Sequence, residues 1–521
     1  MALPSEKLAE SLKLLHQLQN ANGGAAIRAK DLSRTHRERL KANGFLREVM
    51  KGWYVPSRPD EREGDSTAWY ASFWPFVAAY LNARFGKKWS LSPEQSLSLH
   101  GGNWAVPRQL LVRAPRGGNK VVPLRHGTSF LAVRAALPAG ADSVESDGFR
   151  LFSLEAALEE CSPQYFSSHP TDARTALSMV HDVSGLLARL LEGGHSRIAG
   201  RLAGAFRNGG RDRLADEILK TMSAVGYDVR ESDPFDDRPS LALPSRQTSA
   251  AANRIRLLWD KMRAAITGRF PTAPGFPRDA GAYLKGVEDD YVADAYHSLS
   301  IEGYRVSLEL IERVRSGDWN PEVHAQDREQ TNVMAARGYW RSFQVVRKSI
   351  ERVLGGENPG TVAEEDHREW YREMFAPSVA AGILKPADLA GYRGGQVCIR
   401  QSMHVPPSRD AVRDAMPAFF DLLTQETDPA VRIVLGHFVF VYIHPYMDGN
   451  GRMARFLMNL MLAASGYPWV VIPLAEREAY MAALERASVG EDIVPFANLL
   501  ARFMEKRLAG EPHPAMPDKF S

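Results

Sequence analysis

Two apolar segments separated by a short polar loop place the strongest constraint on the fold of this chain. Residues 431–442 and 457–464 are mostly apolar over lengths typical of buried helices. Between them, Pro445 disfavours helical geometry in the residue before it, so the first helix should end at His444. The second helix should begin near Arg452. A hydrophobic core is therefore expected to hold both ends of the loop in place.

The loop has the composition of an anion-binding site. Gly449 and Gly451 let the backbone bend where side chains would clash, and free N–H groups at the start of the next helix attract negative charge. Asn450 adds a side-chain donor. Arg452 and Arg455 are three residues apart on one helix, so both guanidinium groups can grip phosphate oxygens. The segment predicts a phosphate cradle made of Gly449, Asn450, Gly451, Arg452 and Arg455.

Two further side chains bring chemistry to this cradle. Asp448 offers a hard carboxylate oxygen, which suits Mg²⁺ held between protein and substrate phosphates. The imidazole of His444 titrates near neutral pH and can take a proton from an attacking hydroxyl. Taken singly, the histidine would be explained as a capping or core residue and the aspartate as a loop cap. Together with the cradle, they indicate phosphoryl or nucleotidyl transfer.

The string from His444 to Arg452, His-Pro-Tyr-Met-Asp-Gly-Asn-Gly-Arg, resembles the Fic family signature H-P-F-x-[D/E]-G-N-[G/K]-R. The resemblance implies a general base at His444, a Mg²⁺ ligand at Asp448, and nucleotide phosphate contacts at Asn450, Gly451 and Arg452. Tyr446 departs from the family pattern, where phenylalanine is usual. A buried tyrosine hydroxyl normally finds a hydrogen-bond partner, and we expect one here.

Gly451 bears on the group that is transferred. Doc-type kinases, which have a similar loop, carry a lysine at this position, whereas a glycine leaves room for a diphosphate. The resemblance therefore implies a protein adenylyltransferase that moves AMP from Mg-ATP onto a hydroxyl side chain of a target protein. Transfer of another nucleotide, of phosphate or of phosphocholine on the same scaffold stays open.

An upstream segment resembles the inhibitory motif of Fic proteins, [S/T]-x-x-x-E-[G/N]. It comprises Ser298, Glu302 and Gly303, on a helix expected near residues 290–303. Residues four apart share one helix face, so the serine and the glutamate should point the same way. A pair between the Glu302 carboxylate and the Arg455 guanidinium would occupy an arginine needed by the γ-phosphate. We therefore expect an enzyme that inhibits itself.

The segment between these motifs resembles the Fic flap, a hairpin that lies over the active site. Residues 396–400 are expected to form an edge strand or half of a hairpin. In the family, a target segment docks on this hairpin as an added strand. The target protein is therefore expected to dock between Gly395 and Pro407.

Composition and the resemblance together predict a multidomain fold. A mostly α-helical Fic core with a β-hairpin flap follows an N-terminal winged helix-turn-helix and an α/β middle domain that includes a hairpin of residues 108–114 and 120–124. A composition rich in Pro, Ser and acidic residues marks a linker. The predicted boundaries are 1–60 for the winged helix, 61–230 for the middle domain, 231–252 for the linker and 253–521 for the Fic domain.

The N-terminal half weakly resembles AbiEi-type antitoxins and regulators. Its basic residues suit phosphate contacts from helix and wing, although a solvated basic face is nearly as good an explanation. These residues are Arg34, Arg37, Arg39, Lys41, Arg47 and Lys51. The rival function is thus a DNA-binding regulator whose Fic half senses nucleotides. An electrophoretic mobility shift assay on the protein's own promoter, with and without ATP, would separate the two functions.

The whole chain gives weaker constraints. Its 521 residues carry a formal net charge of only +3, so nucleic-acid binding must be argued locally. Two cysteines far apart exclude a disulfide framework and fit a reducing compartment. We expect a cytoplasmic protein without a signal sequence or membrane span, and a homo-oligomer is possible.

Overall fold

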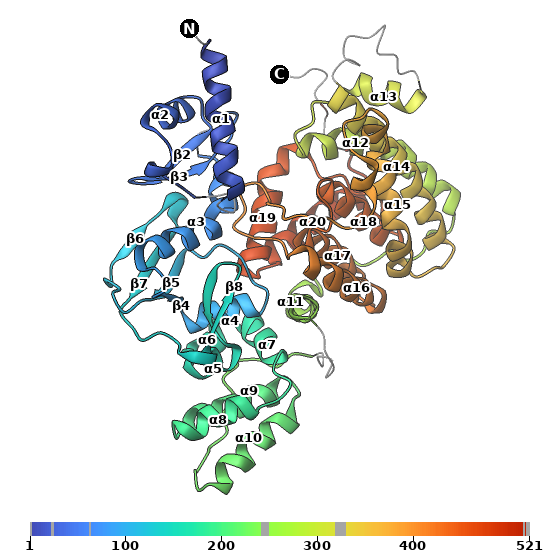
Figure 1. The fold of residues 1–521 in the computed structure, drawn as a ribbon. Coiled ribbons are helices and arrows are strands. Elements are labelled where there is room, and N and C mark those ends of the chain that lie inside the picture. The colour runs from blue at the N-terminus through green and yellow to red at the C-terminus, as the bar shows by residue number, and fades with distance from the viewer. Residues whose placement is uncertain are drawn as a thin grey trace. The chain divides into compact units, whose positions relative to one another are not determined.

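The computed structural model divides into two compact units, which are described separately. The first comprises Met1–Ala250 with Cys398–Pro406, and the second comprises Ala251–Val397 with Pro407–Ser521. Helices dominate both units (Figure 1). The structure describes residues 3–21, 26–61, 64–240, 249–317, 330–513 and 516. Within these ranges, no helix has both the length and the apolar character needed to cross a membrane.

The first unit opens with a small three-stranded antiparallel sheet of order β1-β3-β2. The Ser33 side chain caps helix α2, and Gly44 follows that helix with φ of 76°, a conformation that favours glycine. The elements are α1 (Pro4–Ala21), β1 (Ile27–Arg28), η1 (Ala29–Asp31), α2 (Arg34–Ala42), β2 (Leu46–Met50) and β3 (Trp53–Pro56). This order suits the winged helix-turn-helix interpretation, which stays a prediction.

A four-stranded sheet of order β4-β5-β7-β6 follows. Strand β7 runs parallel to β5 and antiparallel to β6, so the hairpin predicted from residues 108–114 and 120–124 is wrong. Phe130 and Ala132 of β7 are buried, which suits a central strand. Strand β6 contains Pro123, which has no backbone N–H to donate and therefore suits the edge of the sheet. The elements are α3 (Thr67–Phe85), β4 (Ser90–Leu91), α4 (Pro93–His100), β5 (Gln109–Arg113), β6 (Val121–Pro123), η2 (Arg125–Gly127), β7 (Ser129–Val133) and η3 (Gly140–Asp142).

The rest of the first unit is a hairpin followed by short helices. They are β8 (Ser143–Ser146), β9 (Phe149–Phe152), α5 (Leu154–Glu160), α6 (Gln164–Ser168), α7 (Pro170–Ser178), α8 (Ser184–Glu192), α9 (Ser196–Asn208) and α10 (Asp212–Ala224). Residues 231–238, predicted to belong to a linker, instead pack on α9. A Cβ atom added at Gly200 would lie 2.0 Å from the carbonyl oxygen of Arg230. One added at Gly204 would lie 2.2 Å from the carbonyl oxygen of Ser232. The two glycines thus admit the chain, and residues 241–248 of the predicted linker lie outside the described residues.

The second unit is helical in every described element. It contains α11 (Ala250–Ile266), α12 (Ala280–Ile301), α13 (Leu308–Ser316), α14 (Gln330–Leu354), α15 (Pro359–Ala380), η5 (Pro386–Leu389), α16 (Arg409–Gln425), α17 (Pro429–Ile443), α18 (Asn450–Ala463), η6 (Leu474–Glu476), α19 (Arg477–Gly490) and α20 (Val494–Leu508). Nearly all side chains of α17 and α18 are buried. The two apolar segments therefore form neighbouring buried helices, as predicted.

The expected β-hairpin flap is not formed. Residues 391–407 are all described and contain no strand. Within the first unit, the Gln401 amide donates to Thr67 Oγ1 at 3.0 Å, and the Met403 carbonyl accepts from the Val106 amide at 2.7 Å. Backbone groups that would pair across a hairpin thus bond elsewhere. The hairpin prediction is wrong for this structure.

Tyr446 belongs to the loop between α17 and α18, and its side chain is buried, with 1% of the residue's surface exposed. Its ring stacks on Tyr371, with centroids 3.8 Å apart and planes 9° apart. Among the described residues its hydroxyl has no hydrogen-bond partner, so the expectation of a partner is wrong. A buried donor without an acceptor loses its hydrogen bonds to water and gains none in return.

We expect Tyr446→Phe to raise the free energy of unfolding by about 1 kcal/mol, because it removes an unsatisfied buried hydroxyl and keeps the stacked ring. Urea denaturation measures this. Tyr339→Phe is the matched control, since the Tyr339 hydroxyl donates to Asp294 Oδ2 at 2.6 Å and its loss should destabilise the protein. Destabilisation of similar size by both substitutions would contradict the expectation.

Candidate active site

Helix α17 ends at Ile443, directly before His444, as Pro445 predicts. His444 follows it with φ of 53° and ψ of 60°, a left-handed conformation uncommon for residues with a side chain. Its Nδ1 lies 3.2 Å from the carbonyl oxygen of Val441. A carbonyl oxygen only accepts, so we assign the ring proton to Nδ1, which leaves Nε2 able to take a proton.

The local environment keeps this imidazole neutral. Burial is the main cause that lowers the pKa of His444, to about 4, and the positive charge of Arg393 lowers it further. The bond to Val441 and the carboxylates of Glu302 and Asp448 act in the opposite direction. A neutral imidazole at physiological pH is the form that a general base requires.

The loop after His444 is fixed by its own side chains. The Asn450 amide group accepts from the Tyr446 amide at 2.9 Å and donates to the Tyr446 carbonyl at 2.8 Å. The Gly449 amide donates to Asp448 Oδ1 at 2.7 Å. The side chain of Asn450 and the amide of Gly449 were both predicted to contact phosphate. In this structure they instead hold the loop in shape.

The amides that remain available belong to the first turn of α18. The first backbone bond of this helix joins the Met453 amide to the Gly449 carbonyl at 2.9 Å. The amides of Asn450, Gly451 and Arg452 precede it, so they have no acceptor within the helix. The helix dipole adds partial positive charge at the same place. The predicted cradle is therefore carried by these three amides.

The Glu302 carboxylate lies in this cradle. A Cβ added at Gly451 would be only 2.3 Å from Glu302 Oε1. The carboxylate oxygen thus fills the space that the missing side chain leaves open. Because a carboxylate and a phosphate carry the same sign of charge, they cannot share this space without strong repulsion.

Two of the three predicted inhibitory residues, Ser298 and Glu302, bond Arg455. Its Nη2 donates to Glu302 Oε1 at 2.8 Å and to the Ser298 carbonyl at 3.0 Å, and its Nε donates to Ser298 Oγ at 2.8 Å. Gly303 ends the helix with φ of 92°. Although burial opposes its charge, the Glu302 carboxylate raises the pKa of Arg455. The inhibitory segment and the arginine thus meet as the sequence predicts.

Arg452 has a partner that the sequence did not indicate. Its Nη2 lies 3.3 Å from Asp448 Oδ2 and 3.4 Å from the Tyr304 hydroxyl, and its guanidinium stands over the Tyr304 ring at 5.0 Å. The same hydroxyl lies 3.4 Å from Asp448 Oδ2. Tyr304 follows the inhibitory motif directly, and that position is the only signal that could have identified it. The tyrosine extends the contact between α12 and the loop.

Two buried donors in the site have no acceptor among the described residues. They are Nε of Arg452 and Nη1 of Arg455. Buried guanidinium groups normally bond all their donors, and a bound phosphate would supply the missing oxygens. The arginines are therefore arranged for an anion, and the carboxylate satisfies only part of their capacity.

The residues present fit a magnesium ion that is shared with a substrate. Asp448 has a side chain that is 64% exposed and offers oxygen ligands. Mg²⁺ is commonly bound through one or two carboxylates together with substrate phosphates and water. The described residues contain no group of three or more histidine, cysteine or acidic side chains able to hold a metal. Binding of the ion would therefore depend on the phosphates.

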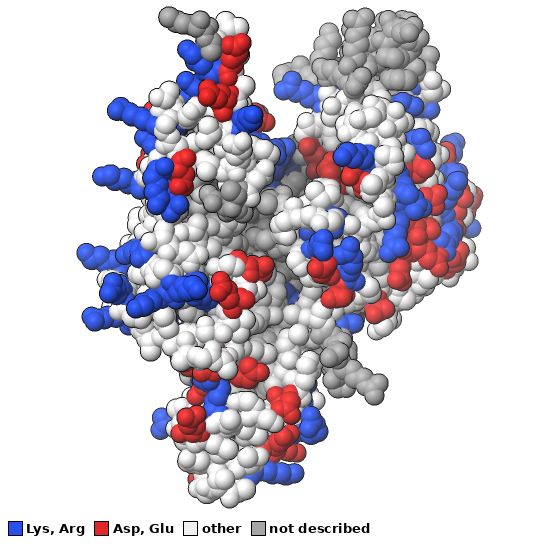
Figure 2. Space-filling view, in the orientation of Figure 1, with Lys and Arg blue, Asp and Glu red and all other residues white. Residues whose placement is uncertain are grey.

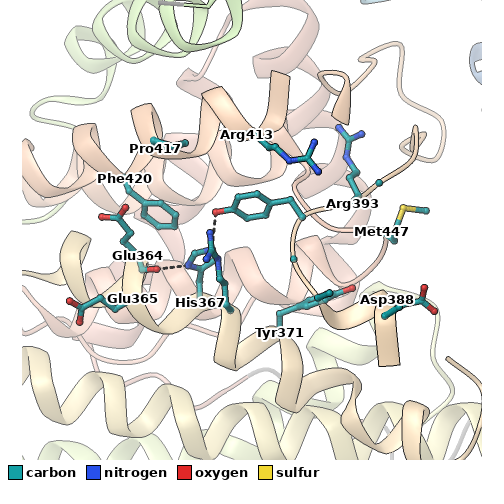
Figure 3. A pocket seen from close by; sticks show the side chains of 16 residues that line it. Glu364, Glu365, His367, Tyr371, Asp388, Arg393, Arg413, Pro417, Phe420 and Met447 are labelled. Atoms are coloured by element: carbon teal, nitrogen blue, oxygen red, sulfur yellow. Dashed lines mark hydrogen bonds between the residues drawn. The ribbon is translucent and has the colours of Figure 1, made fainter. Parts of the chain in front are cut away.

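A cavity of about 1050 Å³ lies next to the loop. Met447, from the loop, lines it together with residues of α15, η5, α16 and the segment 390–394. Figure 3 shows Arg393, Met447 and Asp388 on one side of this cavity and Glu364 with Phe420 on the other. Its wall combines apolar, acidic and basic side chains, so its charge alone does not define an occupant.

Known proteins resemble the part of the chain that carries this site. Residues 362–462 match the Fic/DOC family. The protein adenylyltransferase Fic of Nematostella vectensis is 29% identical over 281 residues, 53% of this chain and 60% of that protein. The Drosophila melanogaster protein of the same name is 26% identical over 273 residues, 52% and 51% of the two chains. The chain thus spans about half to three fifths of these relatives.

The solved structure of Fic-1 from C. elegans covers 68% of this chain and 90% of its own, at 18% identity and a TM-score of 0.37. The family match spans α15 to α18 and includes the complete loop from His444 to Arg452. The part of the chain that carries the candidate site is therefore similar to the Fic/DOC family.

Proposed function

We propose that this protein is an adenylyltransferase that transfers AMP from Mg-ATP to a hydroxyl side chain of a target protein and inhibits itself through Glu302. The observation that carries the proposal is the placement of His444, with Nε2 able to accept a proton, at the start of the loop that leads into α18, whose first three amides have no acceptor within the helix. Relatives named protein adenylyltransferase Fic match about half of the chain.

Each residue has a distinct part in the reaction. Nε2 of His444 takes the proton from the target hydroxyl, whose oxygen attacks the α-phosphorus while the bond to pyrophosphate breaks. The amides of residues 450–452 neutralise charge on the phosphates. Arg452 and Arg455 hold the β- and γ-phosphates once α12 releases them. A magnesium ion on Asp448 would neutralise further phosphate charge.

The inhibitory contact determines whether ATP binds productively. Glu302 fills the space at Gly451 and pairs with Arg455, so the triphosphate meets a like charge and an engaged arginine. Only displacement of Glu302 frees both. The contacts of Glu302 thus support an inhibited form in which ATP cannot bind productively.

A second candidate function, DNA binding by the first unit, has support of a different kind. No acidic residue occurs between Glu94 and Asp142, where six arginines and lysines do. Figure 2 shows Lys and Arg side chains along the side that carries β5, β6 and β7. The helix and wing fit less well, since Arg39 donates to the Lys7 carbonyl and Arg47 to the Glu61 carbonyl. Homo-oligomerisation and a cytoplasmic location also stay predictions.

We expect Glu302→Gly to raise self-labelling with labelled ATP by roughly 10- to 100-fold, the range of a typical coupling between sites. The substitution clears the space at Gly451 and frees Arg455. Scintillation counting of the purified protein measures the labelling. Glu309→Gly, which removes an exposed carboxylate on α13, is the matched control and should leave labelling at the wild-type level. Equal labelling of Glu302→Gly and wild type would refute the inhibitory role.

In the Glu302→Gly background, we expect His444→Ala to lower labelling by at least about 100-fold, because general-base catalysis contributes that much or more. The circular dichroism spectrum should be unchanged. Persistent labelling in a correctly folded His444→Ala variant would overturn the proposed function, whatever the state of the inhibitory helix.

The pH dependence of the Glu302→Gly enzyme follows from the lowered pKa of His444, about 4. The protonated imidazole cannot accept a proton, so activity is lost as pH falls through this pKa and is retained above it. Removal of Glu302 takes away a charge that raises the pKa, which extends the active range further toward acid. Labelling rates from about pH 5.5 to 8 should therefore form a plateau. A decline centred near the ordinary histidine pKa of about 6.5 would contradict it.

For the first unit, we expect a shift of its own promoter DNA in native gels that weakens steeply between low and physiological salt. Substitution of Arg116, Lys120 and Arg134 by glutamine should reduce the shift, and His444→Ala should leave it intact. If the three substitutions leave the shift unchanged, the DNA contact would instead be assigned to the helix and wing. Absence of any shift at low salt would exclude this candidate.

A further inference from the structure

Arg393 is a buried side chain that bonds the catalytic loop directly. Only 2% of its surface is exposed. Its backbone amide donates to the Pro445 carbonyl at 2.9 Å, and its Nε donates to the His444 carbonyl at 2.8 Å. The residue thus holds the two carbonyl groups at the point where α17 ends and the loop begins.

The same guanidinium also bonds both ends of the segment predicted to dock the target. Nη1 donates to the Gly395 carbonyl at 2.9 Å, and Nη2 donates to the Pro407 carbonyl. All four residues belong to the second unit. A planar guanidinium with donors on three nitrogens can make these bonds at once, whereas a lysine ammonium on its flexible stem cannot reproduce this geometry.

His444 needs such support because of its backbone. A left-handed conformation in a residue with a side chain costs free energy and persists where the surroundings hold it. The bond from Arg393 to the His444 carbonyl fixes the peptide plane that follows the imidazole. The imidazole ring is held separately by its bond to the Val441 carbonyl, so the backbone and the ring of this residue are each fixed by a hydrogen bond.

We propose that Arg393 is a positioning residue for the transfer reaction, which sets the orientation of His444 and couples it to the target-docking segment between Gly395 and Pro407. This inference rests on the proposed adenylyl transfer. The competing explanation is that Arg393 only satisfies buried carbonyl groups, in which case it would affect stability and leave catalysis by folded protein unchanged.

The positive charge of Arg393 provides a second readout, which reports its electrostatic effect on His444 separately from the hydrogen bonds that orient the loop. This charge and burial lower the pKa of His444, while Glu302 and Asp448 raise it. Loss of the charge should therefore shift the acid limb of the rate profile to higher pH. Arg393→Lys keeps the charge and loses the forked geometry, so it separates orientation from electrostatics.

The experiment compares Arg393→Lys and Arg393→Met in the full-length Glu302→Gly protein. We expect the limiting rate of self-labelling to fall by about 10- to 100-fold in both, because small misplacement of a catalytic group has effects of this size. The ATP concentration for half-maximal rate should change less than about twofold, since the bonds described for Arg393 go to carbonyl groups of His444, Pro445, Gly395 and Pro407. Only Arg393→Met should shift the acid limb upward. Arg413→Met is the matched control, since this arginine lines the same cavity and pairs with Asp410 instead of the loop.

The outcomes are separable. A parent Glu302→Gly protein without any labelling activity defeats the proposed function and not the role of Arg393 in particular. An active parent whose folded Arg393→Lys variant labels at the parental rate overturns the inference. A raised half-maximal ATP concentration with an unchanged limiting rate also overturns it, because it would place Arg393 in nucleotide binding. If Arg393→Met does not fold, Arg393→Lys alone decides.

Discussion

The break between α17 and α18 is the constraint on which the rest of the site depends. Both helices are buried along nearly their whole length, so the few residues between them have little freedom. Within that span, His444 adopts a left-handed conformation, and the side chain of Asn450 bonds the backbone of the loop. The first amides of α18 then have no acceptor within the helix. The hydrophobic core thus fixes the positions of the proposed base and of the proposed anion cradle.

Sequence reasoning succeeded where local pattern and geometry coincide. The helix end at His444 follows from Pro445, and the meeting of Ser298 and Glu302 with Arg455 follows from residues four apart on one face. Roles inside the loop were less accessible. Asn450 and the Gly449 amide have the right chemistry for phosphate, but the loop uses both for its own bonds. Donor type can be read from a sequence, whereas the acceptor chosen depends on the fold.

Long-range contacts account for the remaining errors. Strand β7 lies between two segments that the sequence suggested would pair, because pairing depends on a strand that comes later. The flap bonds to Thr67 and Val106, which are distant in sequence, and Gly200 and Gly204 receive a segment that resembled a linker. The role of Arg393 gave no signal in the sequence, since its described hydrogen bonds go to carbonyl groups, which every residue has.

Because Gly451 has no side chain, it leaves one space next to its Cα. Under the proposed function, both the Glu302 carboxylate and a substrate phosphate would use this space. Any larger side chain there would push the Glu302 carboxylate aside and, in the same stroke, narrow the room for a diphosphate. Restraint and catalysis therefore cannot be lost or gained independently at this position. Under the proposed function, a bulky residue at 451 would therefore displace the inhibitory carboxylate and exclude the substrate's phosphates at the same time.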